Sequence, residues 1–171
     1  TRVANCFFKP PPYTALPTSA ALSSVELNDG DELYFLGGDI ECAFYRMTIP
    51  DCAKTFMTLP KVKAKHLGVS VLDGKSIDPE TYMTPQLEVL PMGWFWSLFI
   101  CQRVHEVLVS STGLTRDLAV LDRCAPVPLS RQDVRHAEYV DNFLALGHDP
   151  QTVTQHDNSH QTVLNDHGLL Y

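Results

Sequence analysis

The chain contains 171 residues, a length that can enclose one sizeable hydrophobic core, so we expect a single domain. Hydrophobic residues make up 44% of the chain and charged residues 19%, which is typical of a globular protein and excludes a disordered one. The net charge of −7 disfavours a protein whose whole surface binds nucleic acid, although it is compatible with a local basic groove.

Cysteine usage and hydropathy indicate an intracellular protein, in the cytoplasm or the nucleus. None of the five cysteines forms a CxxC pair, and an odd number cannot all pair within the chain, so a reducing compartment is expected. The longest apolar run, Val89–Cys101, is too short to span a bilayer, and we expect no membrane partner. Because the chain starts without Met and stops at "HGLLY", we interpret it as a fragment of a larger polyprotein.

The first 50 residues predict an extended segment followed by one strand. Residues 1–31 are rich in Pro and small side chains, which favour an extended lead-in that lies over the surface. The apolar run Glu32–Asp39 then predicts a core strand with Asp39 at its C-terminal end.

Residues 50–89 predict two further strands, Lys54–Pro60 and Lys65–Leu72, with turns at "DGK" and "DPE". The densest basic cluster of the chain lies here. Such a cluster can be a solvated face or a contact for phosphates, and the sequence leaves both open. Its members are Lys54, Lys61, Lys63 and Lys65.

The second half of the chain predicts a long helix, a hairpin and a second helix. The long helix follows a Pro-Met-Gly turn, and its apolar residues have the i, i+4, i+7, i+8 spacing of a packed face: Ile100, Val104, Val107 and Leu108. A short helix is expected at Arg116–Leu121, a hairpin at Val134–Leu146, and a helix at Gln151–His167 that stops at Gly168. This order of elements predicts an α+β fold, an antiparallel sheet backed by helices.

Two acids stand in apolar surroundings, Asp39 at the end of the first strand and Asp141 at the tip of the hairpin. Asp141 and Asn142 can form an ordinary two-residue turn, because both residue types tolerate positive φ. If the hairpin instead lies beside the first strand, the two carboxylates meet at one sheet edge. Two oxygen ligands suit Mg²⁺ when phosphates and water complete its shell, as in two-metal phosphoryl transfer.

Three segments resemble, in this order, motifs A, B and C of reverse transcriptases, and more narrowly those of retrotransposons and retrovirus-like elements: "GGDIECAFYRMTI", "VLPMGWFWSLFICQ" and "EYVDNFLALG". The resemblance implies a polymerase palm at residues 32–49 and 90–171, with a fingers-like insertion at residues 50–89. It also implies that the thumb and RNase H lie outside this chain, so we expect weak or absent activity from the fragment alone.

The same resemblance implies RNA-directed DNA synthesis. Its partners would be an RNA or DNA template, a primer and deoxynucleoside triphosphates, and its cofactor Mg²⁺, with Mn²⁺ as a substitute. Asp39 and Asp141 match the catalytic, metal-binding aspartates, and the Ile40 carbonyl and Asn142 match further metal ligands. Tyr139 would lie near the primer end, while the basic residues Lys61, Lys63 and Lys65 are candidates for template or triphosphate contacts.

Five residues match positions around the incoming nucleotide: Phe44, Pro91, Met92, Gly93 and Gln102. Phe44 matches the aromatic residue that blocks a 2′-hydroxyl, the atom that separates RNA from DNA. Without the resemblance, the sequence favours a core aromatic at Phe44. Gly93 suits a position where the backbone approaches a base or a sugar closely.

Departures from the family pattern leave a second hypothesis open. Asn142 stands where the family has its second Asp, and an amide oxygen binds a hard cation more weakly than a carboxylate. Leu98 and Cys101 replace the Pro and Phe of many relatives. The alternative is a catalytically dead remnant that binds nucleic acid or a protein.

A third hypothesis, a zinc-dependent hydrolase, rests on His156 and His160, whose i, i+4 spacing on a helix can bind Zn²⁺. The sequence offers no clear third ligand. Val153 and Val163 share the same stripe, which favours packing of both histidines against the back of the sheet.

Overall fold

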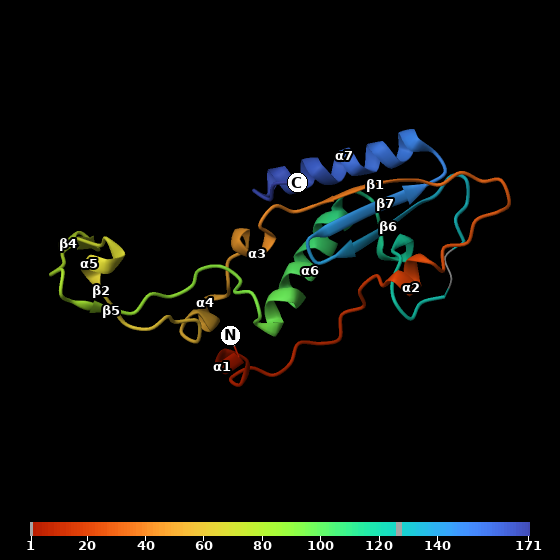
Figure 1. Ribbon diagram of the computed structural model, residues 1–171. Helices are drawn as coiled ribbons and strands as arrows, with labels where there is room; N and C mark the ends of the chain where they lie inside the picture. Colours follow the sequence, from red (N-terminus) through yellow and green to blue (C-terminus); the bar gives the residue numbers. More distant parts are fainter. Residues whose placement is uncertain (1, 126–127) are drawn as a thin grey trace.

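A three-stranded antiparallel sheet forms the centre of the protein, as seen in a computed structural model that describes residues 2–125 and 128–171. Its strands are β1 (Tyr34–Asp39), β6 (Val134–Tyr139) and β7 (Asn142–Gly147), in the order β1-β7-β6 (Figure 1). The chain is thus an α+β protein, and the predicted hairpin is confirmed as β6 and β7.

Two helices of 17 residues each, α6 (Phe95–Ser111) and α7 (Pro150–Asp166), cover one face of this sheet. Val109 of α6 and Val153 of α7 pack in one cluster with Phe143 and Ala145, which are alternate residues of β7. Asp149 starts α7 by accepting hydrogen bonds from two free backbone N–H groups of its first turn. Both long helices appear where the sequence predicts them.

The opposite face of the sheet is covered only toward β6. There Ala21 of α2 (Ser19–Leu22) packs with Val120, Leu129 and Leu146. Residues 2–31 contain one further short helix, α1 (Arg2–Asn5). The β1 side of this face stays open, and Phe35 keeps 68% of its surface exposed.

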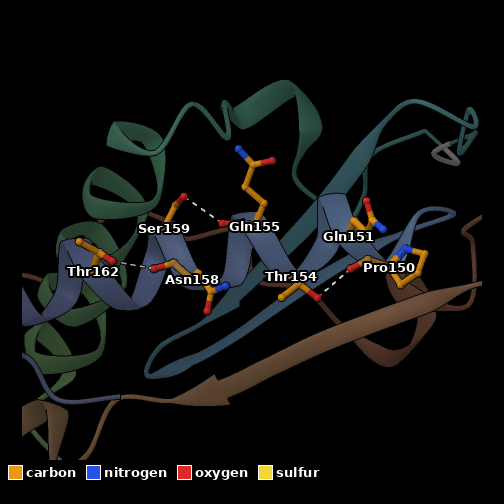
Figure 2. A pocket seen from close by; sticks show the side chains of 7 residues that line it. All are labelled: Pro150, Gln151, Thr154, Gln155, Asn158, Ser159 and Thr162. Carbon is orange, nitrogen blue, oxygen red and sulfur yellow. Dashed lines mark hydrogen bonds between the residues drawn. The ribbon is translucent and has the colours of Figure 1, made fainter.

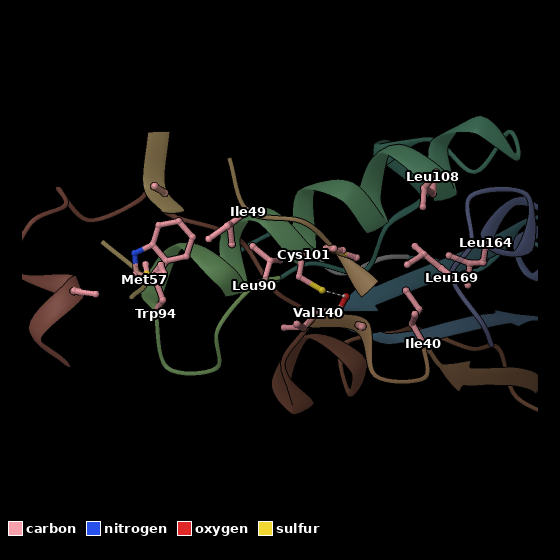
Figure 3. Packing of buried hydrophobic residues seen from close by; sticks show 14 residues of the cluster. Ile40, Ile49, Met57, Leu90, Trp94, Cys101, Leu108, Val140, Leu164 and Leu169 are labelled. Carbon is pink, nitrogen blue, oxygen red and sulfur yellow. Dashed lines mark hydrogen bonds between the residues drawn. The ribbon is translucent and has the colours of Figure 1, made fainter. Parts of the chain in front are cut away.

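A second core lies where the end of β1 meets α6 and the end of α7 (Figure 3). Ile40, Leu90 and Leu164 are almost completely buried there, and Trp94 packs at the start of α6. This cluster joins α3 (Ala43–Arg46), which follows β1, to the hairpin.

Residues 50–89 form short elements at one end of the molecule, away from the three-stranded sheet (Figure 1). They are α4 (Asp51–Lys54), β2 (Val62–Lys63), α5 (Ala64–Leu67), β3 (Val71–Leu72), β4 (Lys75–Ser76) and β5 (Tyr82–Met83). The strands pair as β2 with β5 and β3 with β4.

The two long strands predicted in this region are therefore wrong. Lys54 instead closes a helical turn in which it pairs with Asp51, three residues earlier. Gly68, with φ of 68°, ends α5 inside the second predicted strand, so only Val71–Leu72 of it is extended.

The buried face of α6 also differs from the predicted apolar stripe. Val107 is 68% exposed, whereas Gln102 and His105 are fully buried. These two polar side chains can occupy interior positions because both are hydrogen-bonded to the hairpin. The short helix predicted at Arg116–Leu121 is a 3₁₀ turn at Arg116–Leu118. Among the described residues, no helix is both long and apolar enough to cross a membrane.

Glycine is required at the middle of β1 because its neighbours approach so closely. A Cβ on Gly37 would lie 2.1 Å from the carbonyl oxygen of Phe143 on β7. A Cβ on Gly38 would lie 2.8 Å from the ring of Tyr171, which covers the helix side of the strand. The Gly-Gly pair thus lets β1 lie directly against β7 and Tyr171.

Gly37→Ala should therefore destabilise the fold by about 2–3 kcal/mol, because the rigid backbone of β7 must move to admit the methyl group. Leu36→Ala is the control, since Leu36 is 40% exposed and adjacent in β1. Urea unfolding followed by circular dichroism measures both. Equal midpoints for the two variants would contradict the close approach of β1 and β7.

Candidate functional site

Asp39 and Asp141 lie at the same edge of the sheet. In the β1–β7 register Asp39 is opposite Asn142, and the Ile40 N–H donates a hydrogen bond of 2.8 Å to the Asp141 carbonyl. Asp39 is exposed and Asp141 is partly buried. Within residues 2–125 and 128–171, neither carboxylate forms an ion pair with a Lys, Arg or His side chain. The hairpin lies beside the first strand, which is the arrangement that brings these two acids together.

The hairpin turn is formed by Val140 and Asp141, one residue earlier than the predicted Asp141–Asn142 tip. Val140 has φ of 59°, a left-handed conformation that is unfavourable for a β-branched residue. Asn142 is instead the first residue of β7, and its side-chain amide donates to Asp141 Oδ1 over 3.0 Å. Side chains of α6 that lie beneath the turn and bond Val140 explain this one-residue shift.

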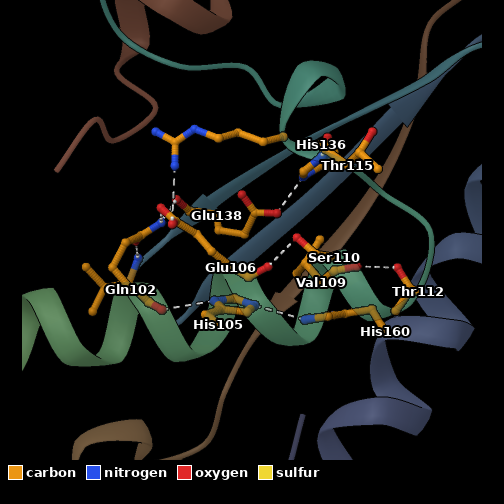
Figure 4. A network of polar contacts seen from close by, with 12 residues as sticks. Gln102, His105, Glu106, Val109, Ser110, Thr112, Thr115, His136, Glu138 and His160 are labelled. Atoms are coloured by element: carbon orange, nitrogen blue, oxygen red, sulfur yellow. Dashed lines mark hydrogen bonds and ion pairs between the residues drawn. The ribbon is translucent and has the colours of Figure 1, made fainter.

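Side chains of α6 hold the turn from the protein interior (Figure 4). Gln102 Oε1 accepts from the Val140 N–H over 2.7 Å, and Gln102 Nε2 donates to the Glu138 carbonyl over 3.0 Å. His105 Nδ1 lies 2.9 Å from the Val140 carbonyl. We call Gln102 and His105 the turn clamp. Gln102 matched a nucleotide-binding position, but its amide is fully buried and bonded to the hairpin.

The turn clamp continues to α7 through a histidine pair. Because the Val140 carbonyl can only accept, His105 Nδ1 carries the hydrogen, and His105 Nε2 of the neutral ring accepts from His160 Nε2–H over 2.9 Å. Burial lowers the pKa of both rings, and a positive charge on a neighbouring ring, His105 or His136, would lower that of His160 further, so the pKa of His160 falls to about 3. Phe143 stacks on His160 with ring centroids 3.9 Å apart. Because burial lowers both pKa values, the histidine pair is neutral at pH 7.

The structure gives no support to a zinc site at His156 and His160. His160 directs Nε2 at His105, and His156 is only partly buried. No group of three or more His, Cys, Asp or Glu side chains that could hold a metal occurs in the part of the chain that the structure describes.

Four of the residues that matched nucleotide-binding positions come together between α3 and the start of α6. Phe44, Met92 and Gly93 line one depression of about 260 Å³, and Pro91 is buried behind it. The Tyr45 hydroxyl donates to Met92 Sδ over 3.6 Å, which ties α3 to this turn.

A second depression, of about 460 Å³, lies over β1 and β7 and includes Asp39, Gly37 and Leu144. Tyr139, 49% exposed, is in register with Asn142 and therefore faces the same side. The open face of the sheet thus carries Asp39, Asn142 and Tyr139 side by side.

The basic cluster is largely neutralised by nearby acids. Lys63 and Lys65 both pair with Glu80, and Lys54 pairs with Asp51 and Glu88. Lys61 is exposed and has no ion pair among the described residues. In Figure 1 the cluster lies in the segment at the end of the molecule away from the three-stranded sheet. Within the cluster, Lys61 is the lysine whose charge is not offset by a described acid.

The outer face of α7 carries a depression of about 600 Å³ lined by Pro150 and by uncharged polar side chains (Figure 2). Its hydroxyl groups at Thr154, Ser159 and Thr162 each donate to a carbonyl of their own helix. With no charged lining residue, this depression offers neither a carboxylate nor a basic side chain.

Sequence reasoning missed the buried pair of His136 and Glu138 on β6. Their side chains are each 3% exposed, and His136 Nδ1 lies 2.5 Å from Glu138 Oε1. Burial disfavours the charged ring, but the hydrogen bond and charge of Glu138 outweigh it and raise the pKa of His136. The signal was the alternation of Val134, His136 and Glu138, which puts all three on the helix-covered face.

Loss of the turn clamp should destabilise the protein more than loss of an apolar contact on the same helix. Gln102→Ala leaves the Val140 N–H and the Glu138 carbonyl buried without partners, at a cost of about 2–4 kcal/mol. Val107→Ala, on the exposed face, should cost less than about 0.5 kcal/mol. Denaturant titration measures the free energy of unfolding of both variants. A larger loss in Val107→Ala than in Gln102→Ala would contradict the role of the turn clamp.

Acid should weaken the fold through His160. An unfolded histidine has a pKa of about 6.5, so between about pH 6.5 and 3 the unfolded state binds more protons and stability falls as the pH falls. His160→Phe keeps the stacking on Phe143 and should reduce the slope of unfolding free energy against pH by up to about 1.4 kcal/mol per pH unit.

The control for this measurement is His167→Phe, because His167 is exposed at the end of α7. This variant measures how far a His-to-Phe change outside the core alters the slope. An unchanged slope in His160→Phe would mean that the buried ring takes up a proton in the folded state.

No model of a known protein family matches this chain, and no curated protein matches it in sequence at a significant level.

Proposed function

We propose that the chain is the palm, with part of the fingers, of a reverse transcriptase that adds deoxynucleotides to a primer 3′-hydroxyl and releases pyrophosphate. One observation carries this proposal. The β1–β7 register and the hydrogen bond between the Ile40 N–H and the Asp141 carbonyl bring Asp39 and Asp141 to one accessible edge of the sheet.

The donor set at this edge fits Mg²⁺ or Mn²⁺. It offers the Asp39 and Asp141 carboxylates and the Asn142 amide oxygen, all hard ligands. Asp39 and Asn142 line an open depression that substrate phosphates and water can reach, and Asp141, next to Asn142 in the chain, is partly buried. Two carboxylates without a basic partner among the described residues also leave a local negative charge for cations to offset. When bound, two such ions polarise the α-phosphate and stabilise the leaving oxygens.

The surrounding side chains support the same reaction by position. Tyr139 borders the acids on the open face, where it would contact the primer end. Phe44 and Gly93 line the depression between α3 and the start of α6, where a flat ring and a residue without Cβ would admit a deoxyribose and exclude a 2′-hydroxyl. Gln102 acts indirectly in this proposal, as a positioning residue beneath the turn.

A second candidate function, a non-catalytic nucleic-acid or protein binding module, is favoured by the contact between Asn142 and Asp141 Oδ1. The amide donor occupies an oxygen that a cation would otherwise use. Asn142 also brings no charge of its own to the site.

Primer extension on an RNA template, with the chain expressed together with its flanking reading frame, tests the proposal. Asp39→Asn and Asp141→Asn should each reduce extension by about a thousandfold or more, because each removes a charge from the site of phosphoryl transfer. Asp166→Asn, an exposed acid at the end of α7, should leave extension unchanged. Extension that survives Asp141→Asn would overturn the site.

Asn142→Asp separates the two candidate functions. If the native chain is a polymerase, it extends a primer and the variant extends faster, because a third carboxylate strengthens cation binding. Extension by the variant alone would assign the native chain to the non-catalytic class. Circular dichroism checks that both proteins fold equally.

A further inference from the structure

A cavity of about 280 Å³ lies between α6 and β6, on the helix-covered face of the sheet. Asp39 and Tyr139 face the opposite side, so this cavity is separate from the paired acids. Its apolar lining consists of Val107, Ala119 and Leu121. The volume suits a molecule of one or two rings, since drug-sized ligands occupy pockets of roughly 300–1,000 Å³.

The inner end of the cavity is formed by the buried pair of His136 and Glu138. His136 uses both ring nitrogens, Nδ1 toward Glu138 Oε1 and Nε2–H toward the Thr115 carbonyl over 2.9 Å. The charge of Glu138 is therefore offset by His136. Its second carboxylate oxygen, however, has no hydrogen-bond partner within the described residues and is left for a donor group in the cavity.

Two arginines form the outer end of the cavity with only one acid between them. Arg103 Nη1 donates to Glu106 Oε2 over 2.5 Å, whereas Arg116 Nη1 lies 3.6 Å from the same oxygen, too far for a hydrogen bond. The Arg116 guanidinium has no hydrogen bond to any described residue, and the 3.6 Å ion pair with Glu106 is its one charge contact there. The outer end thus has a net charge of +1 and a guanidinium whose donors are uncommitted.

We propose that this cavity binds a small, mainly apolar molecule that carries one anionic group, a carboxylate or a phosphate. The anion lies against Arg116 and Arg103, since a guanidinium pairs with such groups through two parallel hydrogen bonds. The apolar body packs on Val107, Ala119 and Leu121. A hydroxyl or amino group at the far end donates to the second oxygen of Glu138.

This site is in contact with the turn clamp. Gln102 Nε2, which donates to the Glu138 carbonyl, also lies 3.1 Å from Glu106 Oε1. A ligand that draws Arg103 away from Glu106 therefore acts on the residue that positions the Val140 turn. Binding itself does not depend on polymerase activity.

Methyl NMR of the 171-residue chain, titrated with 2-naphthoate, tests the proposal. The methyl signals of Val107, Ala119 and Leu121 should shift in a saturable way, with a dissociation constant of about 1 mM, as expected for a probe of this size. 2-Naphthalenemethanol, which has the same rings without the charge, should bind at least about fivefold more weakly.

Two variants and a control locate the probe. Arg116→Gln should weaken 2-naphthoate binding about tenfold while leaving the fold intact, because Arg116 is exposed. Ala119→Phe should abolish binding by filling the cavity. Arg123→Gln, an exposed arginine outside the cavity, should change nothing.

Three results would overturn the proposal. The first is the absence of saturable shifts at these methyl groups. The second is an equal affinity of the chain for 2-naphthoate and 2-naphthalenemethanol, or an equal affinity of the unaltered chain and of Arg116→Gln for 2-naphthoate. Either result would show that the cavity does not recognise the anionic group. The third is complete displacement of the probe by oligo(dT) at matched phosphate concentration, which would assign the arginines to nucleic-acid binding.

Discussion

The turn at Val140 and Asp141 depends on two side chains of a helix that is distant in sequence. Gln102 and His105 bond the N–H and the carbonyl of Val140, the residue with the unfavourable positive φ. Such a conformation costs on the order of 1–3 kcal/mol and persists only where the surroundings determine it. Once the turn is fixed, the Asp141 carbonyl can accept a hydrogen bond from the Ile40 N–H, and Asp39 is brought opposite Asn142. The acidic edge, by which we mean the sheet edge with Asp39 and Asp141, therefore depends for its geometry on hydrogen bonds in the core.

Polar side chains in this core also fix the strand register. If β6 shifted by one residue, Glu138 and His136 would move to the open face and Tyr139 into the interior. The shift would separate His136 from the Thr115 carbonyl and Gln102 from the Glu138 carbonyl. Each buried group left unpaired costs about 1–3 kcal/mol, so the polar network discriminates between registers more strongly than the single alanine of the strand, Ala137, could.

Local patterns predicted the elements whose signals are local. The hairpin, the long helix after Pro-Met-Gly and the stop at Gly168 each follow from residues close together in the chain. The errors have long-range causes. Val107 fits an apolar stripe but is exposed, because contacts with the hairpin turn Gln102 and His105 inward instead.

The candidate site shows the same division between local and long-range causes. Asp39 and Asp141 could be identified from their positions at the ends of apolar runs, but the turn itself was placed one residue late. Asn and Asp are the residues that propensity assigns to such turns, and no local rule favours Val at positive φ. The pair of His136 and Glu138 is likewise invisible to a search for exposed acids, because both lie on the inward side of a strand.

Asn142 affects the acidic edge in two ways that differ in size. Its hydrogen bond to Asp141 Oδ1 is exposed to solvent, so water can replace it at a net cost of about 1 kcal/mol or less. The carboxylate that Asn142 lacks would act on a nearby divalent cation through Coulomb attraction, which amounts to about 4 kcal/mol per pair of unit charges at 4 Å near a protein surface. The missing charge is therefore the larger effect. In the proposed cation site, Asp39 and Asp141, which have no basic partners in the described chain, would have to supply the remaining attraction.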